Sequence, residues 1–455
     1  MTIIIGAGLA GLVCARSLAA KGEDVRVLER SDRPGGVIRT ERREGFLLEM
    51  GPNTVRPTPE LLALVRDLAL ESEVVFSDHR LPRYIDWNGA LHRLPSSPIS
   101  LARTSLLSRR GKLRLAREPF VRRAPLSAPP ETVRMFFSRR LGTEIAERVI
   151  APFVSGIFAG DPNRLSAAEA FPGLARGERL HGSLFATAVA AMRKRDRSAP
   201  RVRGLLSFRN GLEALPRALA ASLGPRLETG TAVESISPGN GGWVVRTSRG
   251  AFEAHRVVLA SAAGDAARFV RDFDAEAFVA LSSIPSPPVA VLHFSWPVSA
   301  LPRGLGGFGH LVVPAPGRRV LGAVWSSSLF PGRAPEGEFL VTAFAGGARD
   351  PGAADLPEEA LARTAGGELR RSVGAASDPR LVAWTRWPRA IPQYEIGHEH
   401  RMAVLARAES RWPGLAFLGS YRGGISVGDV VKSALAIPAA DLAQRPAPEL
   451  MAPLR

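Results

Sequence analysis

Three glycines and one acidic residue near the N-terminus have the types and the spacing that bind a dinucleotide. Gly6, Gly8 and Gly11 form a G-x-G-x-x-G pattern, and Glu29 follows at a spacing of about 20 residues, where a carboxylate can bind ribose hydroxyls. The first glycine permits a tight turn, the second lets the backbone approach a pyrophosphate, and the third lets a helix pack close to a strand. The predicted contacts are Gly6, Ala7, Gly8, Leu9, Ala10, Gly11 and Glu29.

Two strands and a helix must position these residues. Residues 2–5 and 25–28 are short β-rich runs, and residues 9–20 have the apolar spacing of a helix. In this order the N-terminus of the helix faces the phosphates, because its free backbone N–H groups favour negative charge. The sequence therefore predicts a Rossmann-like nucleotide-binding domain.

A glycine pair follows the second strand. Residues 33–40 read R-P-G-G-V-I-R-T, which resembles the R-x-G-G-x-x-x-T/S extension of the FAD-dependent amine oxidase and phytoene desaturase superfamily. This resemblance implies FAD, bound without a covalent link, rather than NAD. Many members carry arginine after the glycine pair, where this chain has Val37, so that polar contact is absent. The implied cofactor contacts are Arg33, Gly35, Gly36 and Val37.

The composition is that of a large globular chain with excess positive charge. Its 455 residues are 45% hydrophobic and carry a formal net charge of +17, which favours anionic partners such as acidic substrates, anionic lipid or nucleic acid. The single cysteine, Cys14, cannot form an intramolecular disulfide and is interpreted as a packing residue in a reducing compartment. No metal site is predicted, because Cys and His residues do not cluster.

The distribution of patterns along the chain predicts an α/β and α+β fold with three parts. A discontinuous Rossmann-like FAD-binding domain is expected over residues 1–82, 203–284 and 396–455. A mixed-sheet substrate domain is expected over residues 83–94 and 285–395, and its first piece reads as a hairpin around Asn88-Gly89. Residues 95–202 are expected to form a helical, membrane-associated insertion.

Basic residues alternate with leucines in the helical insertion. Between residues 103 and 123 there are eight basic side chains and one acid, Glu118, and a second basic cluster covers residues 193–197. Such helices fit the surface of an anionic bilayer; a solvated arginine-rich face is the alternative. Nucleic acid is disfavoured, because the aromatic interleaving of single-strand binders is missing. No apolar run is long enough to span a membrane, and no signal or transit peptide is expected.

Several longer motifs resemble the oxygen-dependent protoporphyrinogen oxidase family from end to end. They are G-P-N-T at 51–54, S-G-I-F-A-G-D-P at 155–162, S-S-S-L-F-P at 326–331, W-P-R-A-I-P-Q-Y at 387–394 and G-G-I-S-V at 423–427. The family resemblance implies an enzyme of haem synthesis in the cytoplasm, peripherally attached to the inner membrane. It also implies molecular oxygen as acceptor, a homodimer, and transfer of product to ferrochelatase.

The same resemblance assigns substrate contacts. It implies that Arg83 binds a substrate propionate, Phe330 packs against a pyrrole ring, and Leu311 lies near an apolar wall. The Gly156 carbonyl would face the macrocycle nitrogens, and Asn53 would lie where flavin and substrate meet. Further implied cofactor contacts are Gly51, Pro52, Asn53, Thr54, Val233, Ser420, Ile425, Ser426 and Val427.

The implied reaction removes six electrons from protoporphyrinogen IX in three turnovers. In each turnover the flavin would accept hydride from a saturated meso carbon while a ring N–H loses its proton, and oxygen would reoxidise the flavin to give hydrogen peroxide. No catalytic acid or base is assigned. The alternatives are oxidation of coproporphyrinogen III to coproporphyrin III, another FAD amine oxidase or desaturase, and a binding protein that has lost its flavin.

Overall fold

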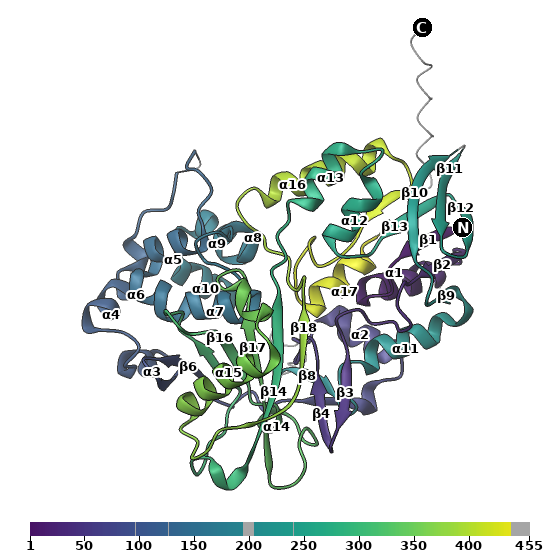
Figure 1. Cartoon of the computed structure of the whole chain (residues 1–455). Helices are drawn as coiled ribbons and strands as arrows, with labels where there is room; N and C mark the ends of the chain where they lie inside the picture. The colour runs from purple at the N-terminus through teal and green to yellow at the C-terminus, as the bar shows by residue number, and fades with distance from the viewer. Residues whose placement is uncertain (96, 126, 194–203, 240, 438–455) are drawn as a thin grey trace.

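Three regions make up the molecule in Figure 1, with the helical insertion on the left, a large mixed sheet below the centre and the nucleotide-binding region on the right. The computed structural model describes residues 1–437, apart from residues 96, 126, 194–203 and 240. The architecture confirms the predicted fold class, with parallel, antiparallel and mixed sheets. The assignment of residue ranges to domains stays a prediction.

A five-stranded parallel sheet forms the centre of the nucleotide-binding region, in the order β19-β13-β1-β2-β9. Side chains of β1 alternate between two hydrophobic clusters, because Ile4 packs into one and Ile3 and Ile5 into the other. The sheet is therefore covered on both faces, as parallel sheets usually are. Its strands are β1 (Thr2–Ile5), β2 (Val25–Leu28), β9 (Leu227–Glu228), β13 (Arg256–Leu259) and β19 (Leu415–Phe417).

Two groups of helices provide this cover (Figure 1). The face of Ile4 packs against α1 (Leu9–Ala19), α2 (Pro59–Asp67), α11 (Ala214–Leu223) and α17 (Val427–Leu435). The other face packs against α12 (Ala263–Val270), α13 (Ala275–Ser282) and α16 (His398–Arg411). The remaining strands here are β3 (Thr40–Arg43), β4 (Phe46–Glu49), β5 (Val74–Phe76), β8 (Leu206–Phe208), β10 (Val233–Gly239), β11 (Gly242–Thr247) and β12 (Gly250–Ala254).

A seven-stranded mixed sheet forms the second region, in the order β18-β14-β17-β16-β15-β6-β7. Its β6–β7 hairpin turns at Asn88 and Gly89, which both have positive φ, as the Asn-Gly pair predicted. α15 (Glu358–Val373) packs on the sheet, and α14 (Ser326–Leu329) follows β16. The strands are β6 (Arg83–Trp87), β7 (Ala90–Arg93), β14 (Val289–Pro297), β15 (Gly309–Val312), β16 (Val320–Val324), β17 (Glu338–Gly346) and β18 (Arg380–Trp387).

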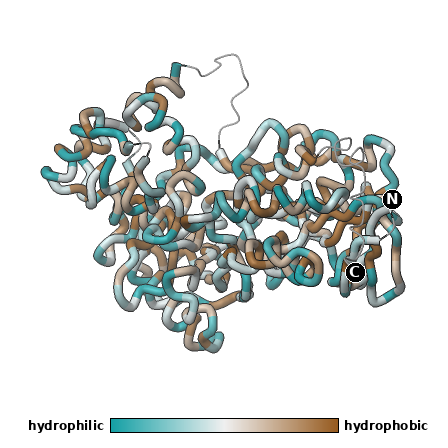
Figure 2. Tube along the Cα trace, turned by 90° about the horizontal axis from the view of Figure 1, so that it is seen from above, coloured by the Kyte–Doolittle hydropathy of each residue, from teal (hydrophilic) through white to brown (hydrophobic). Residues whose placement is uncertain are grey.

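Short helices form the insertion between β7 and β8. They pack around an apolar cluster that includes Phe136 and Phe137, whose rings meet edge to face. No helix in the described part of the chain combines the length and the apolarity that a membrane crossing needs, and Figure 2 shows hydrophilic and hydrophobic residues interspersed along these helices. The helices are α3 (Pro98–Arg103), α4 (Arg109–Ala116), α5 (Val133–Leu141), α6 (Thr143–Ile145), α7 (Ala151–Phe158), α8 (Ala167–Ala170), α9 (Pro172–His181) and α10 (Leu184–Arg193).

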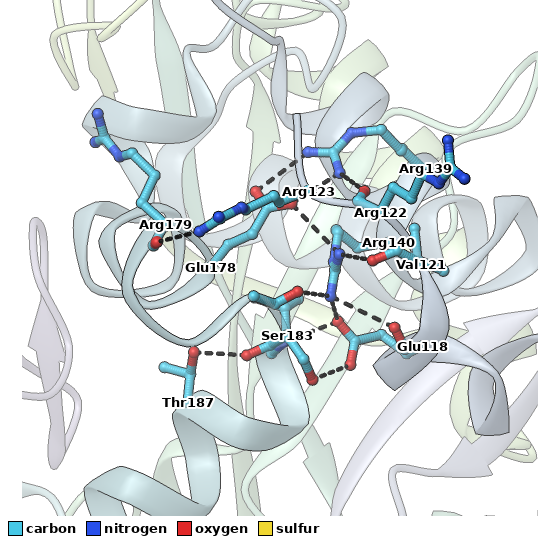
Figure 3. A network of polar contacts seen from close by, with 12 residues as sticks. Glu118, Val121, Arg122, Arg123, Arg139, Arg140, Glu178, Arg179, Ser183 and Thr187 are labelled. Atoms are coloured by element: carbon cyan, nitrogen blue, oxygen red, sulfur yellow. Dashed lines mark hydrogen bonds and ion pairs between the residues drawn. The ribbon is translucent and has the colours of Figure 1, made fainter. Parts of the chain in front are cut away.

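A buried ion pair joins three segments of the insertion (Figure 3). The side chains of Glu118 and Arg140 are both fully buried and in direct contact. The Glu118 carboxylate also accepts hydrogen bonds from the Ser183 hydroxyl and the Leu184 N–H, at 2.7 and 2.8 Å. Burial alone would raise the pKa of Glu118, but these hydrogen bonds and Arg140 outweigh burial and lower it. The carboxylate is therefore charged and fully satisfied.

Candidate functional site

The first glycine turn has no room for side chains at two of its three glycines. Gly6 has a φ of +108°, and a Cβ there would lie 2.9 Å from the carbonyl oxygen of Ala260, the residue after β13. A Cβ on Gly11 would lie 2.0 Å from the Gly6 carbonyl oxygen. Both glycines are therefore required by the protein itself, because β1, the turn and α1 meet backbone to backbone.

Gly8 is different, because a Cβ there would meet no atom within 4 Å. The neighbouring backbone is close on one side only, where Gly8 forms a bridge with Gly35 and the Gly35 N–H donates to the Ala7 carbonyl at 2.8 Å. A glycine that borders open space at the start of a helix has no packing reason within the chain. It fits the close approach of a pyrophosphate, and this supports a bound dinucleotide at the turn.

Glu29 lies directly beside this turn. One carboxylate oxygen accepts a hydrogen bond from the Ala7 N–H at 2.8 Å, and the other accepts from the Ser31 N–H at 2.9 Å. Its backbone carbonyl accepts from the Thr231 N–H, which brings the start of β10 and its half-buried Val233 to the same edge. The structure thus gathers these three predicted contact segments, 6–11, 29 and 233, at one end of the parallel strands.

The second glycine pair packs onto the first turn. A Cβ on Gly36 would lie 3.3 Å from the Gly8 Cα, and one on Gly51 would lie 2.0 Å from the Val37 carbonyl oxygen. The Arg33 guanidinium donates to the Gly36 carbonyl at 2.8 Å and so shapes this loop. Val37 is 47% exposed. Residues 33–37 therefore pack against the turn, residue 51 packs against Val37, and the contacts of both segments with a flavin stay predictions.

The C-terminal loop of predicted cofactor contacts is fixed by Tyr394. Its hydroxyl donates to the Ser420 carbonyl at 2.6 Å and accepts from the Gly424 N–H at 3.0 Å. Ser426 caps α17, because its hydroxyl accepts from the Asp429 N–H at 3.1 Å. The following helix packs on α1, so residues 420–427 lie close to the first turn. Ile425 and Val427 are half-buried in this loop.

Three predicted substrate contacts share one side of the mixed sheet. Strands β6 and β15 run parallel, with Arg83 paired to Gly309 and Ile85 paired to Leu311, so these residues point to the same face. A Cβ on Gly156 of α7 would lie 2.3 Å from the Leu311 Cδ2 atom. Gly156 and Leu311 are therefore in contact, and Arg83 lies along the strand beside them.

Arg83 offers an exposed positive charge at this face. Its guanidinium lies over the Phe308 ring, at 4.9 Å from the centroid. Among the residues that the structure describes, no carboxylate pairs with it. A guanidinium that pairs with no carboxylate of the protein is suited to binding both oxygens of a carboxylate from a ligand.

Asn53 and Phe330 come together in a cavity whose wall also includes Val324, the strand partner of Gly309. Phe330 is 3% exposed and follows α14, whereas Asn53 belongs to the loop after β4 and donates to the Gly51 carbonyl at 3.2 Å. Both side chains line one cavity, where the nucleotide-binding region meets the seven-stranded sheet. The other side chains in its wall include Leu47, Glu49, Ser326 and Arg333.

Sequence reasoning assigned no role to Gln393, although it singled out the I-P-Q-Y motif. The Gln393 amide donates to the Phe158 carbonyl at the end of α7, at 2.8 Å, while its neighbour Tyr394 holds the C-terminal loop. A Cβ on Gly160 would lie 2.6 Å from the Gln393 side-chain oxygen. The two motifs therefore meet in space, and they join the insertion to the cofactor region.

Behind the face of Arg83 and Leu311 lies a second network that sequence reasoning missed. Arg318 donates to Asp86 of β6 at 2.6 Å and to Glu368 of α15 at 2.8 Å. His310, the neighbour of Leu311 in β15, is 3% exposed, and burial lowers its pKa to about 4. This network ties β6 to α15 and to the loop before β16. The described residues contain no group of three or more potential metal ligands.

The fold, the glycine turn at residues 6–11 and the glycine pair at residues 35–36 define a class of protein, the FAD-binding oxidoreductases. Residues 9–437 match the family model of flavin containing amine oxidoreductases. The chain is 35% identical over 461 residues to the chloroplastic protoporphyrinogen oxidase of Oryza sativa subsp. japonica, which covers 95% of this chain and 86% of that relative. It therefore belongs to the protoporphyrinogen oxidase family of flavin-dependent enzymes.

Two further similarities are more distant. The coproporphyrinogen III oxidase of Bacillus subtilis (strain 168) is 26% identical over 457 residues, which covers 94% of this chain and 95% of that relative. A solved structure from Exiguobacterium sp. 255-15 has a TM-score of 0.81 at 22% identity and covers 95% of this chain and 96% of that chain. The structural likeness shows the fold alone.

Proposed function

We propose that this enzyme oxidises protoporphyrinogen IX to protoporphyrin IX, with molecular oxygen as acceptor and hydrogen peroxide as the second product, in haem biosynthesis. The observation that carries the proposal is the face shared by Arg83, Leu311 and Gly156. It combines one unpaired guanidinium with an apolar surface and a backbone carbonyl, as an apolar macrocycle with carboxylate side chains and ring N–H groups requires. The identity to the rice relative supports the same substrate.

Residues of the chain orient the substrate and exclude water from it. Bound FAD supplies the hydride acceptor. Arg83 holds a propionate of the substrate, and the Gly156 carbonyl accepts a hydrogen bond from a pyrrole N–H. Phe330 and Leu311 exclude water from the ring, which strengthens these polar contacts. The glycine turn and Glu29 would hold this cofactor.

The rival substrate is coproporphyrinogen III, because a relative named for it also matches. That molecule has four propionates, so it calls for more cationic partners than protoporphyrinogen, which has two. The deciding experiment measures porphyrin fluorescence in air with both porphyrinogens at equal concentration, after subtraction of nonenzymatic oxidation. Preference for protoporphyrinogen supports the proposal. Preference for coproporphyrinogen moves the enzyme to the other reaction, and oxidation of neither by the FAD-loaded protein refutes both.

Replacing Arg83 by alanine is expected to raise KM for protoporphyrinogen about 10- to 100-fold. A hydrogen-bonded ion pair contributes roughly 1.5–3 kcal/mol, and each 1.4 kcal/mol is about tenfold in affinity. Steady-state kinetics on the FAD-loaded variant measure the effect. Arg80→Ala is the matched control, because Arg80 is exposed in the preceding loop and already pairs with Asp78 at 3.4 Å. An unchanged KM in Arg83→Ala removes the residue from the substrate site.

We further infer that the insertion rests on an anionic membrane surface in the cytoplasm. Phe120 is 86% exposed, Leu180 is 65% exposed and Met192 is 63% exposed. On α10, exposed apolar residues recur at Phe185, Val189 and Met192, the spacing of one helix face. Glu118 holds this edge in place, because it accepts from the Phe185 N–H at 3.2 Å. The second basic cluster, from residue 194 on, lies outside the described residues.

Phe120→Glu is expected to reduce sedimentation with phosphatidylglycerol vesicles about tenfold or more, because burying apolar area gives roughly 25 cal/mol per Å² and the new carboxylate is repelled. Val279→Glu is the control, since Val279 is 61% exposed on α13, outside the insertion. Equal sedimentation of both variants contradicts this placement. A homodimer and transfer of product to ferrochelatase remain further predictions.

A further inference from the structure

The cavity shared by Asn53 and Phe330 contains two charged side chains that the proposed reaction does not use. Glu49 is 4% exposed at the end of β4, and Arg333 is 3% exposed in the loop that also carries Phe330. Their nearest atoms, Arg333 Nη1 and Glu49 Oε1, are 3.7 Å apart. A buried pair at this separation is an attraction between charges and not a direct hydrogen bond.

Arg333 fastens the Phe330 loop to the nucleotide-binding region. Its Nη2 atom donates to the Ser207 hydroxyl at 2.6 Å and to the Phe208 carbonyl at 3.2 Å, both in β8. Its backbone carbonyl accepts from the Leu47 N–H of β4 at 3.1 Å. The guanidinium also lies over the Phe330 ring, at 5.3 Å from the centroid. One residue thus links the aromatic wall of the cavity to β8 through its side chain and to β4 through its backbone.

The Nη1 atom of the Arg333 guanidinium has no such contact. Arg333 Nη1 is buried and has no hydrogen-bond partner among the described residues. A buried guanidinium N–H without an acceptor is costly unless a charge lies close by. Glu49 supplies that charge, and it is itself held by the Leu212 N–H at 2.8 Å and the Thr40 hydroxyl at 2.7 Å.

We propose that Arg333 is a positioning residue for substrate binding, which holds the Phe330 ring in place, and that Glu49 is the counter-ion on which this depends. The inference rests on the proposed function, because it takes Phe330 as a wall of the substrate pocket. Arg333 acts through Phe330 and does not itself touch the reacting atoms.

The pair has a charge balance that depends on pH. Burial raises the pKa of Glu49 to about 7, although Arg333, Thr40 and Leu212 each oppose the shift. The nearby Glu213 raises the pKa of Glu49 further. For the Arg333 guanidinium, burial lowers the pKa, Glu49 raises it, and Arg42 lowers it again. As pH falls through about 7, Glu49 gains a proton and Arg333 loses its counter-ion. Substrate binding is therefore expected to weaken on the acid side.

Two variants test the proposal, Arg333→Lys and Glu49→Gln. We expect Arg333→Lys to weaken protoporphyrin IX binding about tenfold, because a lysine keeps the charge and loses both the forked contacts and the stacking. FAD content, measured by flavin absorbance, is expected to be retained. Binding is followed by titration of the FAD-loaded protein with protoporphyrin IX, so the readout does not depend on turnover. Arg380→Lys is the control, because Arg380 lies over Phe46 at 5.7 Å but pairs with Glu44 in solvent.

The pH dependence gives the second readout. In the wild type, the porphyrin dissociation constant is expected to rise as pH falls through about 7, and in Glu49→Gln this dependence is expected to disappear. Unchanged binding in Arg333→Lys, or an acid-side loss that persists in Glu49→Gln, overturns the proposal. If Arg333→Lys does not fold, the Glu49→Gln profile alone decides. A wild type that binds porphyrin but oxidises no porphyrinogen refutes the proposed function and leaves this test intact.

Discussion

Replacing Gly8 by alanine is expected to give a folded protein that no longer retains FAD. The new methyl group meets no atom of the chain within 4 Å, and Gly8 has an extended backbone with a φ of −67° that alanine adopts freely. The methyl group instead occupies the space where a pyrophosphate approaches the turn. Overpacking of this kind costs about 1–3 kcal/mol, or roughly a 10- to 100-fold loss of FAD affinity. Flavin absorbance after gel filtration and a thermal melt measure the two quantities.

Two other glycine variants serve as comparisons for this prediction. Gly11→Ala places its methyl carbon 2.0 Å from the Gly6 carbonyl oxygen and should therefore lower the melting temperature as well as FAD content. Gly173→Ala, near the start of α9, also meets no atom within 4 Å and should change neither. A Gly8→Ala protein that holds FAD as tightly as the wild type shows that the open space at Gly8 is not the pyrophosphate site.

Replacing Glu118 by alanine is expected to destabilise the helical insertion by about 3–5 kcal/mol. The change leaves the Arg140 guanidinium fully buried without its carboxylate, and removing one member of a buried pair has a cost of this size. It also leaves the Ser183 hydroxyl and the Leu184 N–H without their acceptor (Figure 3). Chemical denaturation measures the loss, and limited proteolysis within residues 109–193 locates it.

Two comparisons separate the buried charge from general damage. Glu147→Ala breaks the pair with Arg134, whose side chains are 53% and 50% exposed, and should cost less than about 1 kcal/mol. The double replacement Glu118→Leu with Arg140→Met removes both charges and should cost less than Glu118→Ala alone. If Glu118→Ala is as stable as Glu147→Ala, the pair does not organise the insertion.

The sequence predicted local elements where one short pattern decides the structure. Residues 2–5, 9–19 and 25–28 form the strand, helix and strand that periodicity indicated, and Asn88-Gly89 makes the hairpin turn. Strand β18 was not predicted, because its exposed Arg380 and Arg386 interrupt the apolar pattern. Helices α12, α13 and α16 were also missed.

Within the site, residues of one motif were easier to predict than contacts between motifs. The glycine turn and Glu29 meet because they belong to one βαβ unit. The cavity shared by Asn53 and Phe330 depends on two regions packing together, and no local pattern records that. Glu49 and Arg333 were missed for the same reason, since a lone acid on a strand and a lone arginine in a loop are ordinary surface residues until the fold buries them.

The order of strands in the central sheet also governs when the enzyme can acquire its flavin during synthesis. Thr2 of β1 pairs with Arg256 of β13, and Val257 of β13 pairs with Leu415 of β19. The turn at Gly6 rests against Ala260, so this motif lacks its support until the chain has been made beyond β13. Contacts so distant in sequence form slowly and expose apolar strands to aggregation meanwhile. We therefore expect flavin capture only after β13 and β19 have been synthesised, although the motif that recognises the flavin is made well before them.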